Sequence, residues 1–562
     1  MDNKFTHDER VAYFSMEIAL RPEIPAYSGG LGILAGDTIR SSADLEIPLV
    51  AVSLVSHAGH FRQEIDDQGR QIEHPDPWSP EQWAKPLEAK VSVPMEGRNV
   101  WVGGWLYILE GHLGGRQPVI FLDTDLNENS QEDRLITHYL YGGDVAYRLN
   151  QEIVLGIGGV RMLQAMGFRI SKYHMNEGHS ALLALELLRR YAYMEEDMRP
   201  GEPPYDIPVV REHCIFTTHT PVEAGQDQFP YDLVERTLGD FIHMDVLKLL
   251  AGDNVMNMTR LALNLSEHIN GVAQRHAETS RRLFPGYQIR AITNGVHPYT
   301  WTSPGFSMLY DEYVKGWCHE PELLVRADRI PDEAVWSAHM QAKGKLIARA
   351  KELCSIELNP ELPILGFARR MTDYKRPNLL FSDMGRLRSI AQKRPFQIVL
   401  AGKAHPRDEG GKRLIELMHA HMRELRGAIP MAYFPNYNME LASIIISGVD
   451  VWLNTPLRPH EASGTSGMKA AFNGIPSLSI LDGWWIEGCI EGVTGWAVGN
   501  ESGSPEGDAE SLYQKLENVV LPLYYNNRGA WLYLMKEVIC KNASFFNSHR
   551  MMQRYAIETY IG

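Results

Sequence analysis

One lysine stands out because of the residues around it. Lys469 lies in the stretch PHEASGTSGMKAAFNGIPSLSILDG (459–483), where most neighbours are small or apolar. This pattern predicts a turn-rich loop over 463–467, a short helix over 468–472 and a strand over 477–481. The helix dipole disfavours a cation in a first turn, and a buried ammonium needs a partner. Either the head of Lys469 reaches water along a buried stem, or this lysine has a chemical role.

A second group of candidate residues is basic and directly follows an apolar run. In the segment GFARRMTDYKRP (366–377), Asp373 is the one acidic residue. The basic residues of this segment are Arg369, Arg370, Lys375 and Arg376. A solvated charged surface would explain such a run, but guanidinium groups after a buried strand also suit a phosphate pocket. Both interpretations stay open at this point.

A glycine-rich turn is the third candidate. The segment YSGGLGILAGDTIRSSADL (27–45) predicts a tight turn that opens a helix, although its spacing is neither GxGxxG nor a Walker loop. Backbone amides of Gly29, Gly30 and Leu31 could hold an anion at this helix start.

The histidines do not predict a metal site. KYHMNEGHS (172–180) offers His174, Glu177 and His179, but it is not HExxH, and histidines five residues apart do not share a helix face. We therefore predict no metal centre. Two further residues, His219 at a strand end and Asn270 in INGVAQRHAE, are uninformative alone.

Short apolar runs that alternate with helical segments must position these residues. Such runs lie at 11–19, 118–125, 214–220, 290–296, 363–370, 396–404, 449–455 and 477–481. The alternation predicts an α/β fold with parallel sheets, whose strand ends carry the ligand sites. Prolines and glycines over 297–335 interrupt the rhythm. We therefore expect one lobe over residues 1–300 and another over 301–562, meeting at a cleft.

Composition narrows the class of protein. The chain has 562 residues, 44% apolar and 22% charged, with a net charge of −15, which favours a folded protein and argues against nucleic-acid binding. The five cysteines are scattered, no signal peptide is evident, and no apolar run reaches membrane-spanning length. We expect a soluble cytoplasmic protein that binds neither nucleic acid nor membrane.

Taken together, the motifs resemble the α-glucan phosphorylase family, which comprises the glycogen, starch and maltodextrin phosphorylases, in its short prokaryotic form. EASGTSGMK resembles the pyridoxal phosphate lysine motif of the family, and ARRMTDYKR resembles its phosphate-pocket motif. SGGLG, HAGHFRQEI, HMNEGHS, FTTHT, NGVAQRHAE and TNGV follow in the family's order, so that the resemblance covers residues 10 to 500. It implies two Rossmann-like lobes with a central cleft, the two-lobe glycosyltransferase fold of the GT-B type, in which the last helix can return to the first lobe.

The resemblance also implies a reaction. Inorganic phosphate would cleave α-1,4-glucan to α-glucose 1-phosphate with retention of configuration, and the phosphate of pyridoxal 5′-phosphate would exchange a proton with it. The implied catalytic residues are Lys469, Arg370, Lys375, His219 and Glu461. The implied cofactor contacts are Lys469, which carries the cofactor covalently, and Thr465, Ser466, Arg369 and Tyr437. The implied substrate contacts are Gly30, Leu31, Asp144, Asn270, Ser463 and Gly464.

Some positions depart from the family pattern, and two alternatives stay open. The best-known members read GTGNMK where this chain reads GTSGMK, and they have Lys and His where Arg369 and Thr372 stand, so we expect rearranged contacts to the cofactor phosphate. A nucleotide-sugar glucan synthase of the same fold would have two glutamates in E-x7-E, where this chain has Glu461 and Lys469. A catalytically inactive glucan-binding protein would lack the lysine or the arginines. The sequence leaves open whether the protein is a homodimer.

Overall fold

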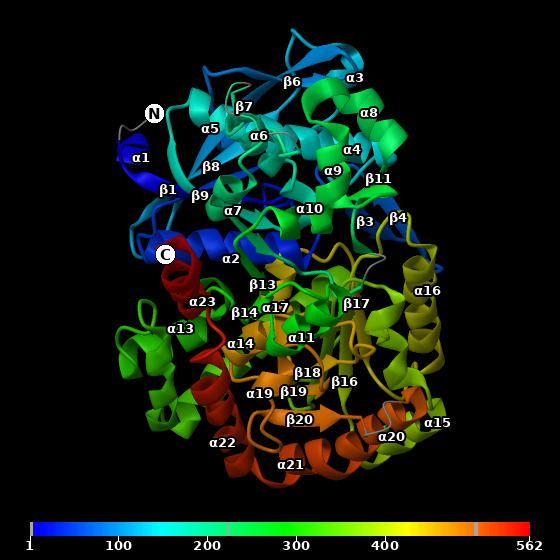
Figure 1. Cartoon of the computed structure of the whole chain (residues 1–562). Coiled ribbons are helices and arrows are strands. Elements are labelled where there is room, and N and C mark those ends of the chain that lie inside the picture. The colour runs from blue at the N-terminus through cyan, green and yellow to red at the C-terminus, as the bar shows by residue number, and fades with distance from the viewer. Residues whose placement is uncertain are drawn as a thin grey trace.

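The computed structural model describes residues 4–194, 196, 198, 201–222, 225–499 and 504–561. It is an α/β protein with two large sheets formed by different parts of the chain (Figure 1). Strands such as β2 and β15 are buried along their whole length, which is the pattern of parallel sheets covered on both faces. The predicted α/β class with parallel sheets is confirmed.

The first sheet has ten strands, of which β14 through β8 are parallel and β5, β6 and β7 antiparallel. In spatial order its strands are β14 (Arg290–Ala291), β13 (His268–Gly271), β10 (Cys214–Thr217), β9 (Arg169–Asn176), β1 (Glu9–Phe14), β2 (Leu49–Leu54), β8 (Arg116–Asp123), β7 (Arg98–Glu110) and β5 (Lys85–Pro86), with β6 (Val91–Met95) paired to β7.

The second sheet has six parallel strands. They are β17 (Met431–Phe434), β16 (Gln397–Ala401), β15 (Ile364–Ala368), β18 (Val451–Asn454), β19 (Ser477–Ile480) and β20 (Gly495–Val498). Each apolar run predicted over 363–481 contains one of these strands. In the first sheet, the run predicted over 290–296 contributes only the two residues of β14.

Helices cover the faces of both sheets (Figure 1). The described α-helices of eight residues or more are α2 (Gly30–Asp44), α4 (Val145–Ile153), α6 (Leu183–Arg190), α8 (Tyr231–Leu238), α9 (Met244–Ala251), α11 (Gln274–Leu283), α13 (Pro304–Tyr313), α14 (Asp332–Cys354), α15 (Met384–Lys393), α16 (Glu409–Glu424), α17 (Met439–Gly448), α20 (Pro505–Lys515), α22 (Arg528–Val538) and α23 (Ser548–Tyr555). Within the described ranges, none is both long and apolar enough to cross a membrane.

Two segments join the sheets. At the C-terminal end, α23 lies against α2 of the first half (Figure 1), and Met551, Met552 and Tyr555 belong to the same apolar core as strands β1 and β2. In the other direction, the hairpin of β3 (Arg62–Ile65) and β4 (Gln71–His74) reaches the second sheet. There the Gln63 and Gln71 side-chain amides donate to the carbonyls of Gly402 and Ala404, both at 2.9 Å.

Candidate active site

Two predicted motifs converge at the carboxyl ends of neighbouring strands in the second sheet. Strand β15 ends at Ala368, directly before the basic run, and β18 ends at Asn454, before the loop that carries Glu461. These strands pair in parallel, so their carboxyl ends lie side by side. The helix α18 (Ser466–Ala471), which contains Lys469, follows the same loop.

A buried ion cluster forms where these motifs meet. The Glu461 carboxylate oxygen Oε2 accepts from Arg369 Nη2 at 2.7 Å and from Lys375 Nζ at 2.6 Å. All three residues are buried. Burial alone would raise the pKa of Glu461, but the charges of Arg369 and Lys375 outweigh it and lower that pKa. Glu461 is therefore an ionised carboxylate between two cations.

Several polar groups beside this cluster have no partner. Arg369 Nη1 and the Ser463 hydroxyl are buried without a hydrogen bond. Lys469 Nζ forms no hydrogen bond or ion pair with any described residue, and it lies 4.1 Å from the centroid of the Trp301 ring. Burial lowers the pKa of Lys469 to about 8, against the opposing charge of Asp37. Because buried polar groups are normally paired, Arg369 Nη1 and the Ser463 hydroxyl are free to contact a ligand at this position.

The loop before Lys469 requires its glycine. Gly464 has φ +78°, in the left-handed region, and a Cβ there would lie 3.1 Å from Glu461 Cδ.

The Thr465 carbonyl accepts from Lys469 N at 3.2 Å, and the Ser466 hydroxyl accepts from Trp452 Nε1 at 3.1 Å. Thr465 directly precedes α18, and Ser466 is its first residue.

The predicted start of this helix was wrong. The helix begins at Ser466, two residues before the predicted start, because Ser466 and Gly467 continue into it. Lys469 consequently lies in the last turn, where the dipole favours a cation. Burial still disfavours a charged Lys469, whereas the helix dipole does not.

The glycine-rich turn is only partly free to bind an anion. The predicted helix within 27–45 is confirmed and begins at Gly30, but the Glu17 carboxylate already accepts from the amides of Ser28 at 2.5 Å and Gly29 at 3.0 Å. The prediction that Gly29 offers its amide to an anion was therefore wrong. Gly30 is exposed, with open space where a Cβ would stand, and Leu31 is half-buried behind it.

Arg370 and Tyr437 have different surroundings. Arg370 is exposed, and its charge adds to burial in lowering the pKa of His405 to about 4. Tyr437 is half-buried, and burial raises the pKa of its phenol while the nearby Arg369 charge opposes that rise. Arg370 thus lies outside the buried cluster, near the histidine, and Tyr437 lies near Arg369.

The predicted residues of the first half are held by structural hydrogen bonds. His219 donates its backbone N–H to Glu177 at 2.7 Å, and its ring Nε2 lies 2.6 Å from Asn176 Oδ1. The Asn270 amide contacts Thr217 Oγ1 and Tyr555 Oη, both at 2.9 Å, and exposed Asp144 caps α4 by accepting from Tyr147 N at 2.9 Å. The structure gives Asn270 and Asp144 no contact with the Glu461 cluster.

Sequence reasoning missed two residues of interest. The Trp301 ring faces Lys469 Nζ, and its indole N–H donates to Asp37 at 2.8 Å. Asn294 is buried with an unpaired Oδ1. Asn294 lies inside the quoted TNGV motif, so that motif was the available signal, whereas no spacing pattern connects Trp301 to Lys469.

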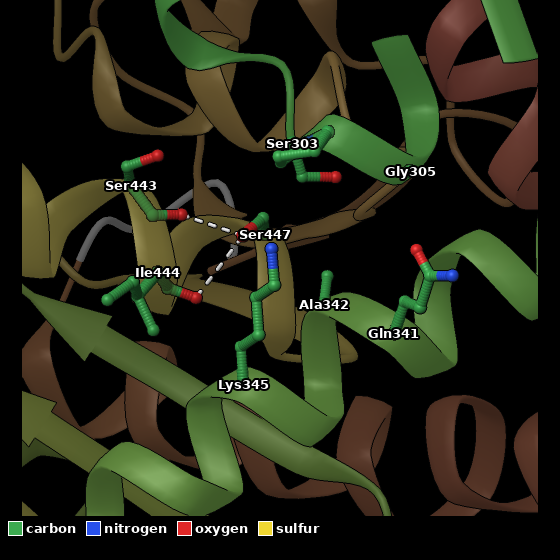
Figure 2. Close-up of a pocket in the computed structure, with 9 residues that line it drawn as sticks. Ser303, Gly305, Gln341, Ala342, Lys345, Ser443, Ile444 and Ser447 are labelled. Carbon is green, nitrogen blue, oxygen red and sulfur yellow. Dashed lines mark hydrogen bonds between the residues drawn. The ribbon is translucent and has the colours of Figure 1, made fainter. Parts of the chain in front are cut away.

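A separate small cavity lies between α13, α14 and α17. Figure 2 shows Lys345 reaching from α14 toward Ser447, whose hydroxyl donates to the carbonyl of Ser443 at 2.7 Å. The cavity measures about 90 Å³ and is lined by Ser303, Pro304, Gly305, Gln341, Ala342, Lys345, Ser443, Ile444 and Ser447. None of the predicted site residues lines it, so the candidate site rests on the ion cluster instead.

Comparisons with known proteins find relatives over nearly the whole chain. The family model described as carbohydrate phosphorylase matches residues 168–495, which include Lys469 and the whole basic run. The chain is 41% identical to maltodextrin phosphorylase of Thermococcus litoralis, over 98% of this chain and 70% of that one. It is 34% identical to glycogen phosphorylase of Aquifex aeolicus, over 99% and 86%, and 31% identical to an uncharacterized protein of Methanocaldococcus jannaschii, over 98% and 99%. By its matched span and these relatives, the chain belongs to the carbohydrate phosphorylase family.

Proposed function

We propose that this protein is an α-glucan phosphorylase that uses inorganic phosphate to cleave α-1,4-glucan and releases α-glucose 1-phosphate with retention. The observation that supports this most is the unpaired, buried Lys469 beside the Glu461–Arg369–Lys375 cluster. The matched relatives named maltodextrin and glycogen phosphorylase support the same substrate class.

The proposal includes pyridoxal 5′-phosphate held at Lys469. A lysine with a pKa of about 8 has a substantial neutral fraction near neutral pH, and a neutral amine is the form that reacts with an aldehyde. Arg369 Nη1 offers an unused donor to a phosphate group, and Thr465, Ser466 and Tyr437 are the other proposed contacts. When bound, the cofactor would supply a phosphate group that exchanges a proton with the substrate phosphate.

The proposed substrate phosphate binds to Lys375 and Arg370, with the Gly30 and Leu31 amides on the opposite side. Two phosphates at one site repel unless cations hold them, and this chain supplies three nearby cations in Arg369, Arg370 and Lys375. A phosphate anion would compete with Glu461 for Lys375. The Glu461 carboxylate would then be free to accept from a sugar hydroxyl.

The other proposed sugar contacts differ in whether their polar groups are already hydrogen-bonded. Ser463 has an unpaired hydroxyl and Gly464 adjoins it, so both are proposed sugar contacts. The main-chain carbonyl of His219 is proposed to face the reacting sugar. Asn270 and Asp144 would first have to give up their present hydrogen bonds.

The proposal extends to organisation and location. Residues 1–300 and 301–562 would form the two Rossmann-like lobes of a GT-B type fold, with the site between the Gly30 turn and the ends of β15 and β18. The described cysteines are unpaired, which suits a reducing cytoplasm. The synthase alternative is disfavoured because Lys469 stands at the second glutamate position, and the inactive alternative because Lys469, Arg369 and Arg370 are all present.

The test combines cofactor and activity measurements. Purified protein should carry about one pyridoxal phosphate per chain, and borohydride reduction with peptide mapping should place it on Lys469. The protein should release α-glucose 1-phosphate from maltodextrin and phosphate, and Lys469→Ala should not. Extension of glucan from UDP- or ADP-glucose, with no reaction of glucose 1-phosphate, would show that the synthase alternative is right.

A further inference from the structure

Three potential metal ligands from distant parts of the chain meet behind the candidate site. Asp44 ends α2, His297 precedes α12 (Pro298–Trp301), and His549 lies in α23. One carboxylate oxygen and one ring nitrogen from each histidine lie within 4.8 Å of one another, and all three side chains are buried. Asp44 Oδ2 is 2.8 Å from His297 Nε2 and 3.5 Å from His549 Nε2.

The hydrogen bonds of His549 leave a lone pair aimed at the carboxylate. His549 Nδ1 lies 3.3 Å from the carbonyl oxygen of His319. A carbonyl can only accept, so Nδ1 carries the proton, and in the neutral ring Nε2 carries a lone pair. That Nε2 is fully buried and has no hydrogen-bond partner. A lone pair facing a carboxylate is repulsive unless a cation lies between them.

The separation favours a metal ion over a proton as that cation. A charge-assisted N–H···O bond between an imidazolium and a carboxylate should be about 2.7–2.9 Å long. Two ligands of one tetrahedral zinc ion, each about 2.0–2.2 Å from it, should lie about 3.3 Å apart. The observed 3.5 Å between His549 Nε2 and Asp44 Oδ2 is closer to the second value.

Each of the three side chains also has the kind of outer partner that orients a metal ligand. His297 Nδ1 accepts from the Thr300 backbone N–H at 3.2 Å and lies 2.7 Å from the Thr300 hydroxyl, and the other Asp44 oxygen accepts from Leu113 N at 3.0 Å. His549 has the His319 carbonyl. Such contacts fix the tautomer and direction of ligating histidines and carboxylates.

We propose that Asp44, His297 and His549 bind a divalent transition-metal ion, with zinc the best match to two imidazoles and one carboxylate. In the occupied site the ring proton of His297 moves from Nε2 to Nδ1, where the Thr300 hydroxyl accepts it in place of the present Thr300 N–H contact, and the Nε2 lone pair binds the ion. The separation of His297 Nε2 and Asp44 Oδ2 then lengthens from 2.8 Å by about half an ångström to reach the spacing of zinc ligands.

The role of this ion is structural. It joins the end of α2, the start of α12 and α23, and none of its ligands belongs to the Glu461 cluster. Helix α2 begins at Gly30 of the candidate site, and α12 ends at Trp301, which faces Lys469. The ion therefore stabilises the scaffold behind the site.

Metal content of the full-length protein tests the proposal. Protein expressed with zinc and dialysed without chelator should contain about one zinc per chain by elemental analysis, and removal with a chelator should lower the thermal unfolding midpoint by several degrees, reversibly on zinc addition. His549→Gln and Asp44→Asn should lose the metal. The matched control is His419→Gln, which removes a half-buried ring whose buried Nε2 is also unpaired and belongs to no such cluster among the described residues, and this variant should keep the metal.

Cobalt substitution keeps the test decisive if the variants fail to fold. Wild-type protein stripped of metal should bind one cobalt per chain with the intense visible absorption of a tetrahedral site. Fewer than about 0.1 metal ions per chain, with no effect of added zinc on the midpoint, would overturn the proposal. Full metal content in a folded His549→Gln variant would overturn it as well, because the ion would then be bound elsewhere.

Discussion

Two buried carboxylates of the second half each lie between two basic side chains, but they differ in how many neighbouring polar groups are hydrogen-bonded. Glu461 lies between Arg369 and Lys375 at the candidate site. Asp450, directly before β18, lies between Lys343 Nζ at 2.8 Å and His339 Nε2 at 2.9 Å. Both carboxylates are buried, and in both the opposing charges outweigh burial and lower the pKa, for Asp450 to about 2.

The difference lies in the groups around them. Lys343 also donates to the Leu362 carbonyl at 2.8 Å, and the Asp450 oxygen that Lys343 contacts, Oδ2, also accepts from Ile364 N at 2.8 Å. Of the groups that contact Asp450 or Lys343 in this described part of the chain, only His339 has a buried ring nitrogen without a partner, Nδ1. At the candidate site Arg369 Nη1 and the Ser463 hydroxyl are buried and unpaired, and Lys469 Nζ faces the Trp301 ring. Buried charge alone therefore does not mark a functional site, and the candidate site differs in that Arg369 Nη1 and the Ser463 hydroxyl are buried beside the carboxylate without a partner.

Removing the Asp450 charge should have the largest effect on stability. Asp450→Asn leaves Lys343 as an uncompensated buried cation, and breaking a buried ion pair in this way costs about 3–5 kcal/mol of unfolding free energy. Urea unfolding followed by fluorescence should show it. Glu440→Gln, which removes an exposed partner of Arg349, is the control and should change stability by about 1 kcal/mol or less. A midpoint equal to wild type would show that the Asp450 cluster is not structural.

Removing the Glu461 charge should affect activity more than stability. Glu461→Gln should lower kcat about 100-fold, the upper range for one charged hydrogen bond. Phosphate should restore most of any lost stability, because it can pair with Arg369 and Lys375, and it should not do so for Asp450→Asn. The measurements are maltodextrin phosphorolysis and unfolding with and without phosphate. Equal responses of both variants to phosphate would remove the distinction between the two clusters.

Arg370 should contribute less, because it is exposed. Arg370→Ala should raise the KM for phosphate about tenfold, the lower range for a charged contact, and Arg370→Lys should recover part of the loss because it keeps the charge without the planar fork. Steady-state kinetics with phosphate varied at saturating maltodextrin would measure it. Unchanged phosphate dependence would mean that Arg370 is part of a solvated surface.

The pH dependence of cofactor uptake should give the smallest effect. With a pKa of about 8, the neutral fraction of Lys469 rises about fivefold between pH 7 and pH 8 and at most doubles above that. The rate at which the cofactor-free protein binds pyridoxal phosphate, followed by absorbance, should show this profile. Lys469→Arg, which keeps the cation, is the control and should show no covalent uptake. A tenfold rise per pH unit continuing to pH 10 would mean that the pKa of Lys469 is that of an ordinary lysine.

The sequence predicted four of the six strands of the second sheet, because these are continuous apolar runs bounded by glycine and polar residues, and it did not predict β17 or β20. It also indicated the basic run and Lys469 as candidate site residues, because both follow such strands. It did not predict which basic residues pair, since the burial of Arg369 and the exposure of Arg370 depend on packing between segments. Contacts between distant segments were likewise out of reach: Trp301 facing Lys469, Tyr555 holding Asn270, and Asp44 meeting two histidines.

The return of α23 to the first half has a consequence for how this protein is made. Met551, Met552 and Tyr555 complete the core around β1 and β2, and Tyr555 also holds Asn270 next to β10. Synthesis proceeds from the N-terminus, so these side chains leave the ribosome after every strand of both sheets. Until then the nascent first half exposes an apolar face with no cover, and such faces recruit chaperones or aggregate. The first sheet, although translated first, is thus among the last parts of the molecule to be finished.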